Sequence, residues 1–262
     1  MNTMNKKWLM PLLATLALPL AGCDDTNTRY VDRDVPVETM PVDGHTLGFW
    51  TMQTQTCADG VAAICVNDNS PYGNDLVLED ANLKPLAARD LKRGDSDIGG
   101  QIIQINADSE SLPAQLRTPA NSVFASTPVG DVFAIHLRLK PAASDTPQTV
   151  LSLGTGVFNV EASRNSLVVG FPTQGKRLLL PLDGSGGWAE LYVASDGQTV
   201  SLKLNCAVIA GFSKAAGTPM LSRDASTLTL GARPTAPTSE HYSGLIDLLR
   251  VSDMNEADLF CE

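Results

Sequence analysis

From residue 48 onward, apolar and polar residues alternate with a period of two along much of the chain. In the segment 132–140 (VFAIHLRLK) every second residue is apolar, so one face of a strand would be buried. The other face carries His136, Arg138 and Lys140, which we interpret as a solvated basic stripe. Similar short β-rich runs follow at 158–162, 166–171 and 199–206.

Turn signals separate these runs. Asp196-Gly197 stands between the runs 188–193 and 199–206 and is typical of a two-residue hairpin. Helical periodicity is nearly absent, and only the segment 252–260 (SDMNEADLF) has the spacing of a helix start. The pattern predicts an all-β fold, a two-sheet antiparallel sandwich or jelly roll.

The first 22 residues are patterned differently. Lys6 and Lys7 precede an apolar stretch at 8–20, and two small residues follow it. Such a stretch is too short to cross a bilayer as a helix and has the layout of a secretory signal peptide. We therefore expect the chain to be exported and residues 1–22 to be removed.

Residues 20–23 (LAGC) resemble the lipobox of bacterial lipoproteins, in which the cysteine becomes a lipidated amino terminus. The resemblance implies that Cys23 is a membrane anchor. Each methylene group buried in the membrane contributes about 0.8 kcal/mol of binding, so several acyl chains anchor a protein far more firmly than one. In enterobacterial lipoproteins an Asp after this cysteine favours the inner membrane, and Asp24 occupies that place. The expected location is the bacterial envelope, at the periplasmic face of the inner membrane, with the outer membrane or cell surface as the alternative.

The segment after the anchor is acidic and poor in large apolar residues. Residues 24–47 hold six acids against two arginines. A segment of this composition buries too little surface to offset the entropy of ordering. We interpret 23–47 as a lipidated flexible linker and 48–262 as one domain.

Charge limits the class of partner. The chain has a formal net charge of −10 at pH 7, which disfavours a nucleic-acid partner. The basic residues within 84–93 are interrupted by acids, and Lys176-Arg177 is isolated. This argues against a heparin-like polyanion as ligand.

Four cysteines remain once Cys23 is set aside, namely Cys57, Cys65, Cys206 and Cys261. An even number in an exported chain favours two disulfides over metal ligation. Three pairings are open, among them Cys57 with Cys65, which closes a small loop, combined with Cys206 with Cys261. Zinc is disfavoured because the chain has no Cys-x-x-Cys pair.

Several segments together resemble the laminin G-like module of the concanavalin A-like jelly-roll superfamily. They are the tryptophan strand 187–193 with its Asp-Gly turn, TLTLG at 227–231 and YSGLIDLLRVSD at 242–253, with looser matches at 47–53, 68–80 and 99–112. The amino-terminal module of thrombospondins carries one cysteine after the strand that follows the Asp-Gly turn and another past the closing strand. The resemblance covers 48–262 and implies a Cys206 to Cys261 disulfide.

The superfamily includes lectins, glycanases and adhesion modules, so the fold alone does not give the function. A retaining glycanase needs two carboxylates roughly 5 Å apart. Alternating acids occur at Asp95 with Asp97 and at Asp108 with Glu110, both in predicted loops, and the Glu-x-Asp-x-x-Glu pattern of the family's glycanases is absent. We therefore expect no catalysis.

Candidate binding residues lie in one predicted loop and among the aromatic residues. Asp68, Asn69, Asn74 and Asp75 offer the oxygen ligands that calcium prefers. The same residue types are also what a plain turn needs, and the turn is the favoured interpretation. Calcium is thus the one candidate cofactor.

Aromatic side chains suit stacking on sugar rings. Trp50 and Trp188 fall within strand patterns, where a place in the core is favoured. Tyr72 and Tyr242, next to Gly or Ser, are the expected surface residues for ligand binding.

The sequence thus predicts a lipid-anchored, non-catalytic binding or adhesion module for a glycan or protein. The first alternative is a structural subunit of an envelope assembly, which would show an exposed apolar patch. The second is a glycoside hydrolase whose acids converge from different strands.

Overall fold

The computed structural model describes residues 40–57, 63–80, 82–86, 91–106, 114–222, 224–232 and 240–256. The elements are β1 (Thr46–Thr56), β2 (Ile64–Asp68), β3 (Leu76–Asp80), β4 (Leu91–Asp95), β5 (Gln101–Ile105), β6 (Ala114–Arg117), α1 (Val123–Ser126), β7 (Val132–Lys140), β8 (Gln148–Leu153), β9 (Phe158–Ser163), β10 (Ser166–Phe171), η3 (Pro172–Gln174), β11 (Lys176–Pro181), β12 (Ala189–Asp196), β13 (Thr199–Leu204), β14 (Ala207–Ser213), β15 (Leu228–Leu230) and β16 (Leu245–Ser252). The fold is almost entirely β, as the period-two pattern predicts. In the described part, no helix is long and apolar enough to cross a membrane.

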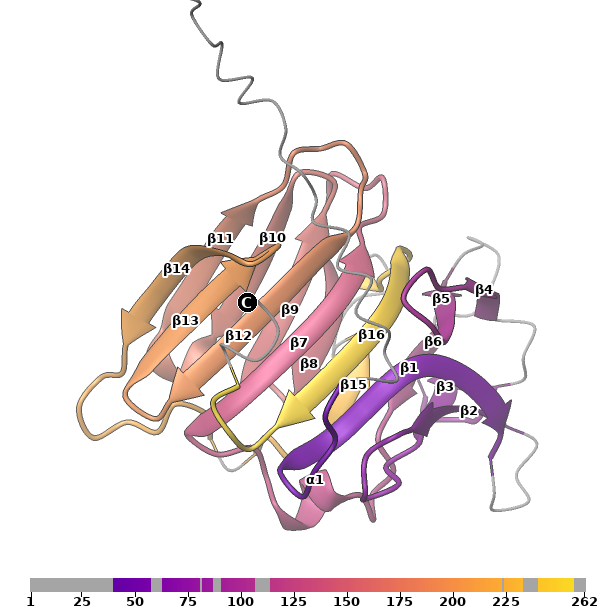
Figure 1. Cartoon of the computed structure of the whole chain (residues 1–262), viewed down its shortest axis with the longest axis horizontal. Helices are drawn as coiled ribbons and strands as arrows, with labels where there is room; N and C mark the ends of the chain where they lie inside the picture. Colours follow the sequence, from indigo (N-terminus) through magenta and orange to yellow (C-terminus); the bar gives the residue numbers. More distant parts are fainter. Residues whose placement is uncertain are drawn as a thin grey trace, which may run out of the picture. The chain divides into compact units, whose positions relative to one another are not determined.

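The strands form two layers (Figure 1). Neighbouring strands follow the order β11-β10-β9-β8-β15-β6-β3-β2-β1-β16-β7-β12-β13-β14, and all the pairings between these strands are antiparallel. The front layer consists of β1, β16, β7, β12, β13 and β14, and the rear layer of β6, β15, β8, β9, β10 and β11. Strands β2 and β3 connect the two layers. The first and last strands are neighbours, with Thr46 opposite Ser252. The predicted two-sheet jelly-roll sandwich is confirmed.

The core between the layers is apolar and rich in aromatic rings. Phe158 of β9 packs edge-to-face on Phe171 of β10, with ring centroids 5.2 Å apart, and Phe133 of β7 lies 6.5 Å from Phe158. These three rings are fully buried. Burial of one such side chain stabilises the fold by roughly 1.5–3 kcal/mol, so contacts between rings of the two layers help to fix how they stack.

Strand β7 has the bounds that the alternation predicts, 132–140, but both of its faces are buried. His136 is 3 % exposed and Arg138 is 6 % exposed. The interpretation of these two residues as a solvated stripe is therefore wrong. The reason is that β7 lies between β16 and β12 and that side chains from distant segments cover its outer face.

The Asp196-Gly197 hairpin is confirmed. Strands β12 and β13 pair on either side of it, and Gly197 has φ +88°, a backbone conformation that glycine adopts freely. The Asp196 carboxylate accepts hydrogen bonds from the backbone N–H groups of Gln198 and Thr199. Residues 253–256 form no helix, and the rest of the predicted terminal helix lies outside the described residues.

The domain begins slightly before residue 48. Strand β1 starts at Thr46, and Met40 packs against the buried pair Phe49 and Leu248. The predicted signal peptide 1–22, and Cys23 after it, lie outside the described residues.

Candidate functional site

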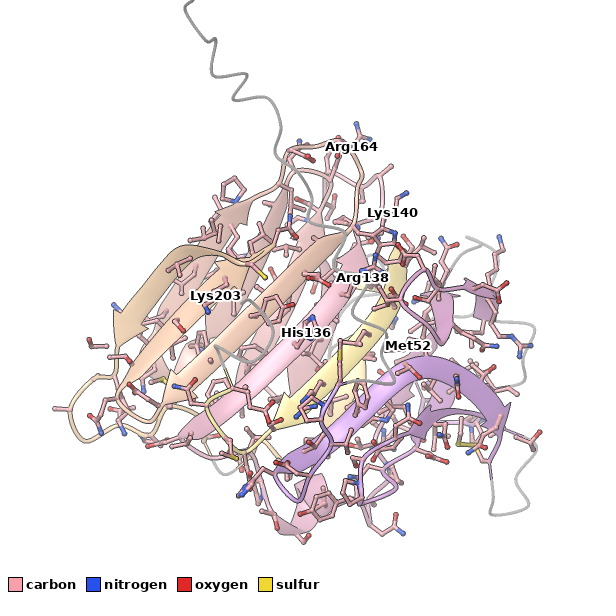
Figure 2. All side chains as sticks on the ribbon, viewed as in Figure 1. Met52, His136, Arg138, Lys140, Arg164 and Lys203 are labelled. Atoms are coloured by element: carbon pink, nitrogen blue, oxygen red, sulfur yellow. A yellow bond between two sulfur atoms is a disulfide. The ribbon has the colours of Figure 1, made fainter. Side chains whose placement is uncertain are left out.

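A group of charged residues with one tryptophan lies on the outer face of the front sheet (Figure 2). Its members are Asp97, Arg138, Trp188, Glu190 and Asp247, which we name the Arg138 cluster. Arg138 reaches the outer face because its two neighbours in β7 point into the core. Asp97 comes from the turn after β4, Trp188 directly precedes β12, and Asp247 lies at a register shift in β16.

Arg138 holds this cluster together. Its Nη1 and Nη2 donate to the two carboxylate oxygens of Asp97 over 2.7 and 3.0 Å, and Nη1 also donates to Asp247. Its Nε lies 3.8 Å from Glu190 Oε1, and its guanidinium carbon lies 4.5 Å from the centroid of the Trp188 ring. A bidentate arginine–carboxylate pair and a cation–π contact both fix orientation. The arrangement is therefore held in one geometry.

The Asp97 carboxylate accepts hydrogen bonds from Arg138 and is held in its ionised form. The hydrogen bonds from Arg138 lower the pKa of Asp97. The pKa values of Asp43, Asp131 and Asp196 are lowered as well. A general acid at neutral pH requires the opposite shift. The cluster is thus suited to binding.

Asp247 is the buried member of the cluster. Its side chain has no exposed surface, and Oδ2 accepts from Arg138. Its Oδ1 is buried and has no hydrogen-bond partner in the described part of the chain. Such an unsatisfied acceptor is uncommon in folded proteins and costs free energy.

His136 lies next to the cluster on the same face of β7. Its ring stacks on Tyr192 with centroids 4.2 Å apart. Burial, together with the positive charges of Arg250 and Arg138, lowers its pKa to about 3. A cavity of about 10 Å³ adjoins His136 and Glu256, which is room for roughly one water molecule. At neutral pH the imidazole is uncharged.

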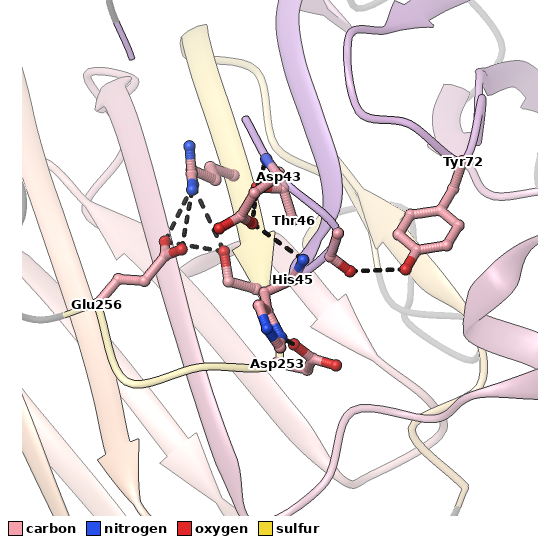
Figure 3. A network of polar contacts seen from close by, with 9 residues as sticks. Asp43, His45, Thr46, Tyr72, Asp253 and Glu256 are labelled. Atoms are coloured by element: carbon pink, nitrogen blue, oxygen red, sulfur yellow. Dashed lines mark hydrogen bonds and ion pairs between the residues drawn. The ribbon is translucent and has the colours of Figure 1, made fainter. Parts of the chain in front are cut away.

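Arg250 joins the two ends of the domain (Figure 3). It is 2 % exposed, donates to the Glu256 carboxylate over 3.0 and 2.8 Å, and donates to the carbonyl of Pro41. Close by, His45 Nδ1 lies 2.9 Å from Asp253 Oδ1. Residues before β1 and after β16 are thus pinned to the same place beside the cavity.

The predicted calcium loop is densely hydrogen-bonded. Both carboxylate oxygens of Asp68 accept hydrogen bonds, over 2.6–2.9 Å. The donors are the backbone N–H groups of Phe49, Ser70 and Asn74 and the Ser70 hydroxyl. The side chain of Asn74 donates to Leu47 O over 2.8 Å. These contacts are those of a buried turn that ties the loop to β1.

The remaining residues of that loop also have protein partners. Asn69 Nδ2 donates to Thr51 Oγ1, and Asp75 accepts from the backbone of Asp68 and from the Gln55 amide. Within the described ranges, no three His, Cys, Asp or Glu side chains converge in a way that could hold a metal ion. Calcium at this loop stays a prediction.

The two tyrosines proposed for ligand contact differ. Tyr72 is 44 % exposed, and its hydroxyl donates to Gly44 O over 2.6 Å. Tyr242 is fully buried, and its hydroxyl donates to Lys140 O over 2.8 Å, so the expectation that it lies at the surface is wrong. Its aromatic ring lies in the core, although its sequence neighbours His241 and Ser243 are polar. The same burial raises its pKa.

The two tryptophans also differ. Trp50 is fully buried, as expected, and its Nε1 donates to Asn74 O over 3.0 Å. Trp188 is partly exposed on the outer face, so its expected place in the core is wrong. The alternation could have placed Trp188 on the outer face. Leu191 and Val193 face the core, so the even-numbered residues of this run face outward.

The cysteines support two disulfides. Cys57 and Cys65 are bonded and link the end of β1 to β2. Cys206 is also disulfide-bonded, and its partner lies outside the described residues, so the pairing with Cys261 stays a prediction. Cys206 does not continue β13 as the alternation suggests, because Asn205 and Cys206 both have positive φ and form a tight turn into β14.

The structure describes one of the two acid pairs noted in the sequence, Asp95 with Asp97. Asp95 ends β4 and Asp97 joins the Arg138 cluster, whereas Asp108 and Glu110 lie outside the described residues. The sequence singled out neither Asp97 nor Arg138 as a site residue, because it placed Asp97 in a loop and Arg138 in a solvated stripe.

No protein-family model and no curated protein matches this chain. Solved structures are similar in fold. A structure of botulinum neurotoxin type C, whose cell entry depends on interaction with two ganglioside molecules, has a TM-score of 0.53 and 12 % identity, covering 78 % of this chain and 47 % of that chain. The binding domain of botulinum neurotoxin DC, in complex with rat synaptotagmin II, has a TM-score of 0.53 and 10 % identity, covering 80 % and 49 %.

A third similar structure is domain 4 of AbnA, a GH43 extracellular arabinanase from Geobacillus stearothermophilus, in complex with arabinotriose. Its TM-score is 0.52 at 14 % identity, covering 75 % of this chain and 92 % of that domain. The chain spans about half the length of the neurotoxin chains and most of the arabinanase domain. At these identities the likeness establishes the fold, a β-sandwich of the jelly-roll type.

Proposed function

We propose that this chain is a lipid-anchored envelope protein whose jelly-roll domain is a non-catalytic binding module for a glycan or a protein. The observation that carries the proposal is the Arg138 cluster, which presents the partly exposed Trp188 beside carboxylates paired with Arg138 in a fixed geometry. A rigid aromatic ring with a few oriented polar groups is what small-ligand sites use for recognition.

Two observations favour binding over hydrolysis. Arg138 contacts Asp97, Asp247 and Glu190 together, and its positive charge favours the ionised form of a neighbouring carboxylate, as the lowered pKa of Asp97 reflects. The similar structures supply a parallel, since their titles describe interaction with gangliosides, with a protein and with arabinotriose. The pKa of Asp97 is lowered, which is the opposite of the shift that the acid of a glycoside hydrolase needs.

The anchor is proposed on the sequence of residues 20–23. Cys23 would carry the acyl chains, and Asp24 favours retention at the inner membrane facing the periplasm. Mass spectrometry of the amino-terminal peptide tests this, with an acylated Cys23 expected. A Cys23→Ser chain should leave the membrane fraction, and retention of that variant in the membrane would contradict the anchor.

A glycan array together with partner capture by crosslinking in the native envelope tests the binding function. The Cys23→Ser chain, with its disulfides intact, would be applied to the array with calcium and again with a chelator. Selective binding to a glycan, or one reproducible protein partner, supports the proposal. A chain with neither would not be a binding module.

The first alternative, a structural subunit of an assembly, has one observation in its favour. Val208 and Ile209 on the edge strand β14 are 70 % and 44 % exposed, and β14 carries no charged side chain. Uncharged edges can pair with another chain. A bulge at these residues shifts the register between β13 and β14, which protects the edge. If the domain assembles through β14, sedimentation should show an oligomer for the parent chain and a monomer for Val208→Lys. A monomeric parent chain would favour the binding module instead.

A further inference from the structure

We propose that the Arg138 cluster binds an uncharged glycan, stacked against Trp188 and hydrogen-bonded to Asp97 and Glu190. This inference rests on the proposed binding function and narrows its ligand class and its location. The ligand would contact the outer face of the front sheet, between the turn after β4 and the start of β12.

The accessible members of the cluster have the chemistry that sugars require. The side chain of Asp97 is 54 % exposed and that of Glu190 is 29 % exposed, while Trp188 is partly exposed. Carboxylates accept hydrogen bonds from hydroxyl groups, and an aromatic ring packs against the apolar face of a sugar ring. Because Arg138 orients both Asp97 and Trp188, little ordering would remain to be done on binding.

A second observation points to a ligand and is independent of the exposed acids. The fully buried Asp247 shares Arg138 Nη1 with Asp97, yet its Oδ1 has no hydrogen-bond partner among the described residues. Buried acceptors are normally satisfied. A polar group that enters the cluster could satisfy this one, and a hydroxyl group would do so without adding charge.

The charges around the cluster disfavour an ionic ligand. Asp97 is ionised, because Arg138 lowers its pKa, and it would repel a uronate or a sulfated sugar. Lys140 lies two residues beyond Arg138 on the same face of β7, roughly 7 Å along the strand. This ammonium group disfavours an amino sugar whose nitrogen lies at that end of the site. A neutral polyhydroxylated ligand meets neither penalty.

The test compares glycan classes and variants in the Cys23→Ser chain. Neutral, amino-bearing and uronate oligosaccharides on one array define the class, and calorimetric titration with the best neutral oligosaccharide gives the affinity. Trp188→Ala and Asp97→Asn are each expected to weaken this binding about tenfold or more. Asp145→Asn is the matched control, because its carboxylate is 80 % exposed and lies outside the cluster. Thermal unfolding verifies that each variant is folded.

The outcomes separate the inference from the function. Neutral binding that is lost in folded Trp188→Ala and Asp97→Asn, and kept in Asp145→Asn, supports the inference. Undiminished binding by both cluster variants overturns the site, and selective binding of charged glycans overturns the ligand class, while in both cases the binding function stands. Binding to a protein but to no glycan overturns the inference alone. Binding to neither a glycan nor a protein overturns both the inference and the proposed function.

Discussion

Arg138 and Asp97 are 41 residues apart in sequence, and the guanidinium of one donates two hydrogen bonds, of 2.7 and 3.0 Å, to the carboxylate of the other. The pair attaches the turn after β4 to the middle of the front sheet. It also orients the Trp188 ring, which lies against the guanidinium. This relationship turns the outer face of β7 from an expected solvated stripe into a candidate binding site.

Replacement of Arg138 should destabilise the fold. In Arg138→Met the buried Asp247 carboxylate loses its partner, and loss of one partner of a buried pair costs about 3–5 kcal/mol. Urea unfolding measures this free energy. Arg164→Met is the control, because its ion pair with Asp145 is exposed, and its effect should be below about 1 kcal/mol. Equal effects of the two substitutions would contradict the role of Arg138.

His136 should make the domain less stable as the pH falls. In the unfolded chain a histidine takes up a proton near pH 6.5, whereas the buried His136 does so only near its pKa of about 3. The unfolded state therefore binds more protons below neutral pH, and stability present above pH 6.5 is lost on acidification. Between pH 7 and about pH 4.5 the loss should be roughly 2–3 kcal/mol.

A His136→Gln chain tests this assignment by urea unfolding across the same pH range. Its stability should change less with pH than that of the parent. His45→Gln, which alters an exposed histidine, should keep the parent's pH dependence. A His136→Gln chain that keeps the full pH dependence would show that another group is responsible.

Asp68 should matter for stability whether or not calcium binds. Its carboxylate accepts four hydrogen bonds that hold the loop against β1. Hydrogen bonds to a charged group contribute about 1.5–3 kcal/mol each, so Asp68→Ala should cost at least about 2 kcal/mol in a chelator. Thermal unfolding of the parent with and without calcium then tests the predicted metal. If calcium raises the melting temperature and Asp75→Asn abolishes this increase, the result supports a calcium site. A melting temperature that does not change with calcium contradicts the site.

The second disulfide can be mapped directly. Peptide mass spectrometry without reduction should find one peptide pair that joins Cys57 to Cys65 and another that joins Cys206 to Cys261. The second pair would fasten the chain end to the turn between β13 and β14. A Cys206 peptide bonded to any other cysteine would contradict the resemblance to thrombospondin modules.

The alternation of the sequence predicted the strands well, because local period and turn chemistry determine them. The segment 132–140 forms β7 with the expected bounds, and Asp196-Gly197 forms the expected turn. Cys206 departed from the pattern because a side chain that fits the alternation can still lie in a turn of positive φ.

The candidate site could be predicted only in part, because contacts distant in sequence create it. The partners of Arg138 lie 41 and 109 residues away, and no local pattern places them beside β7. Tyr242 was misplaced for the same reason, since its hydroxyl donates to Lys140 O, 102 residues away in sequence at the end of β7. The alternation around Trp188 and that in 132–140, which put Arg138 on the non-core face, were local signals for the outer face.

Tryptophan fluorescence tests the central claim most directly. After removal of the signal peptide two tryptophans remain, the fully buried Trp50 and the partly exposed Trp188, so a ligand on the Arg138 cluster has one accessible reporter. Addition of a neutral oligosaccharide that the array identifies should shift the emission of the parent chain and leave that of Trp188→Phe unchanged. Binding with no change in the emission of Trp188 would place the ligand elsewhere and contradict the account.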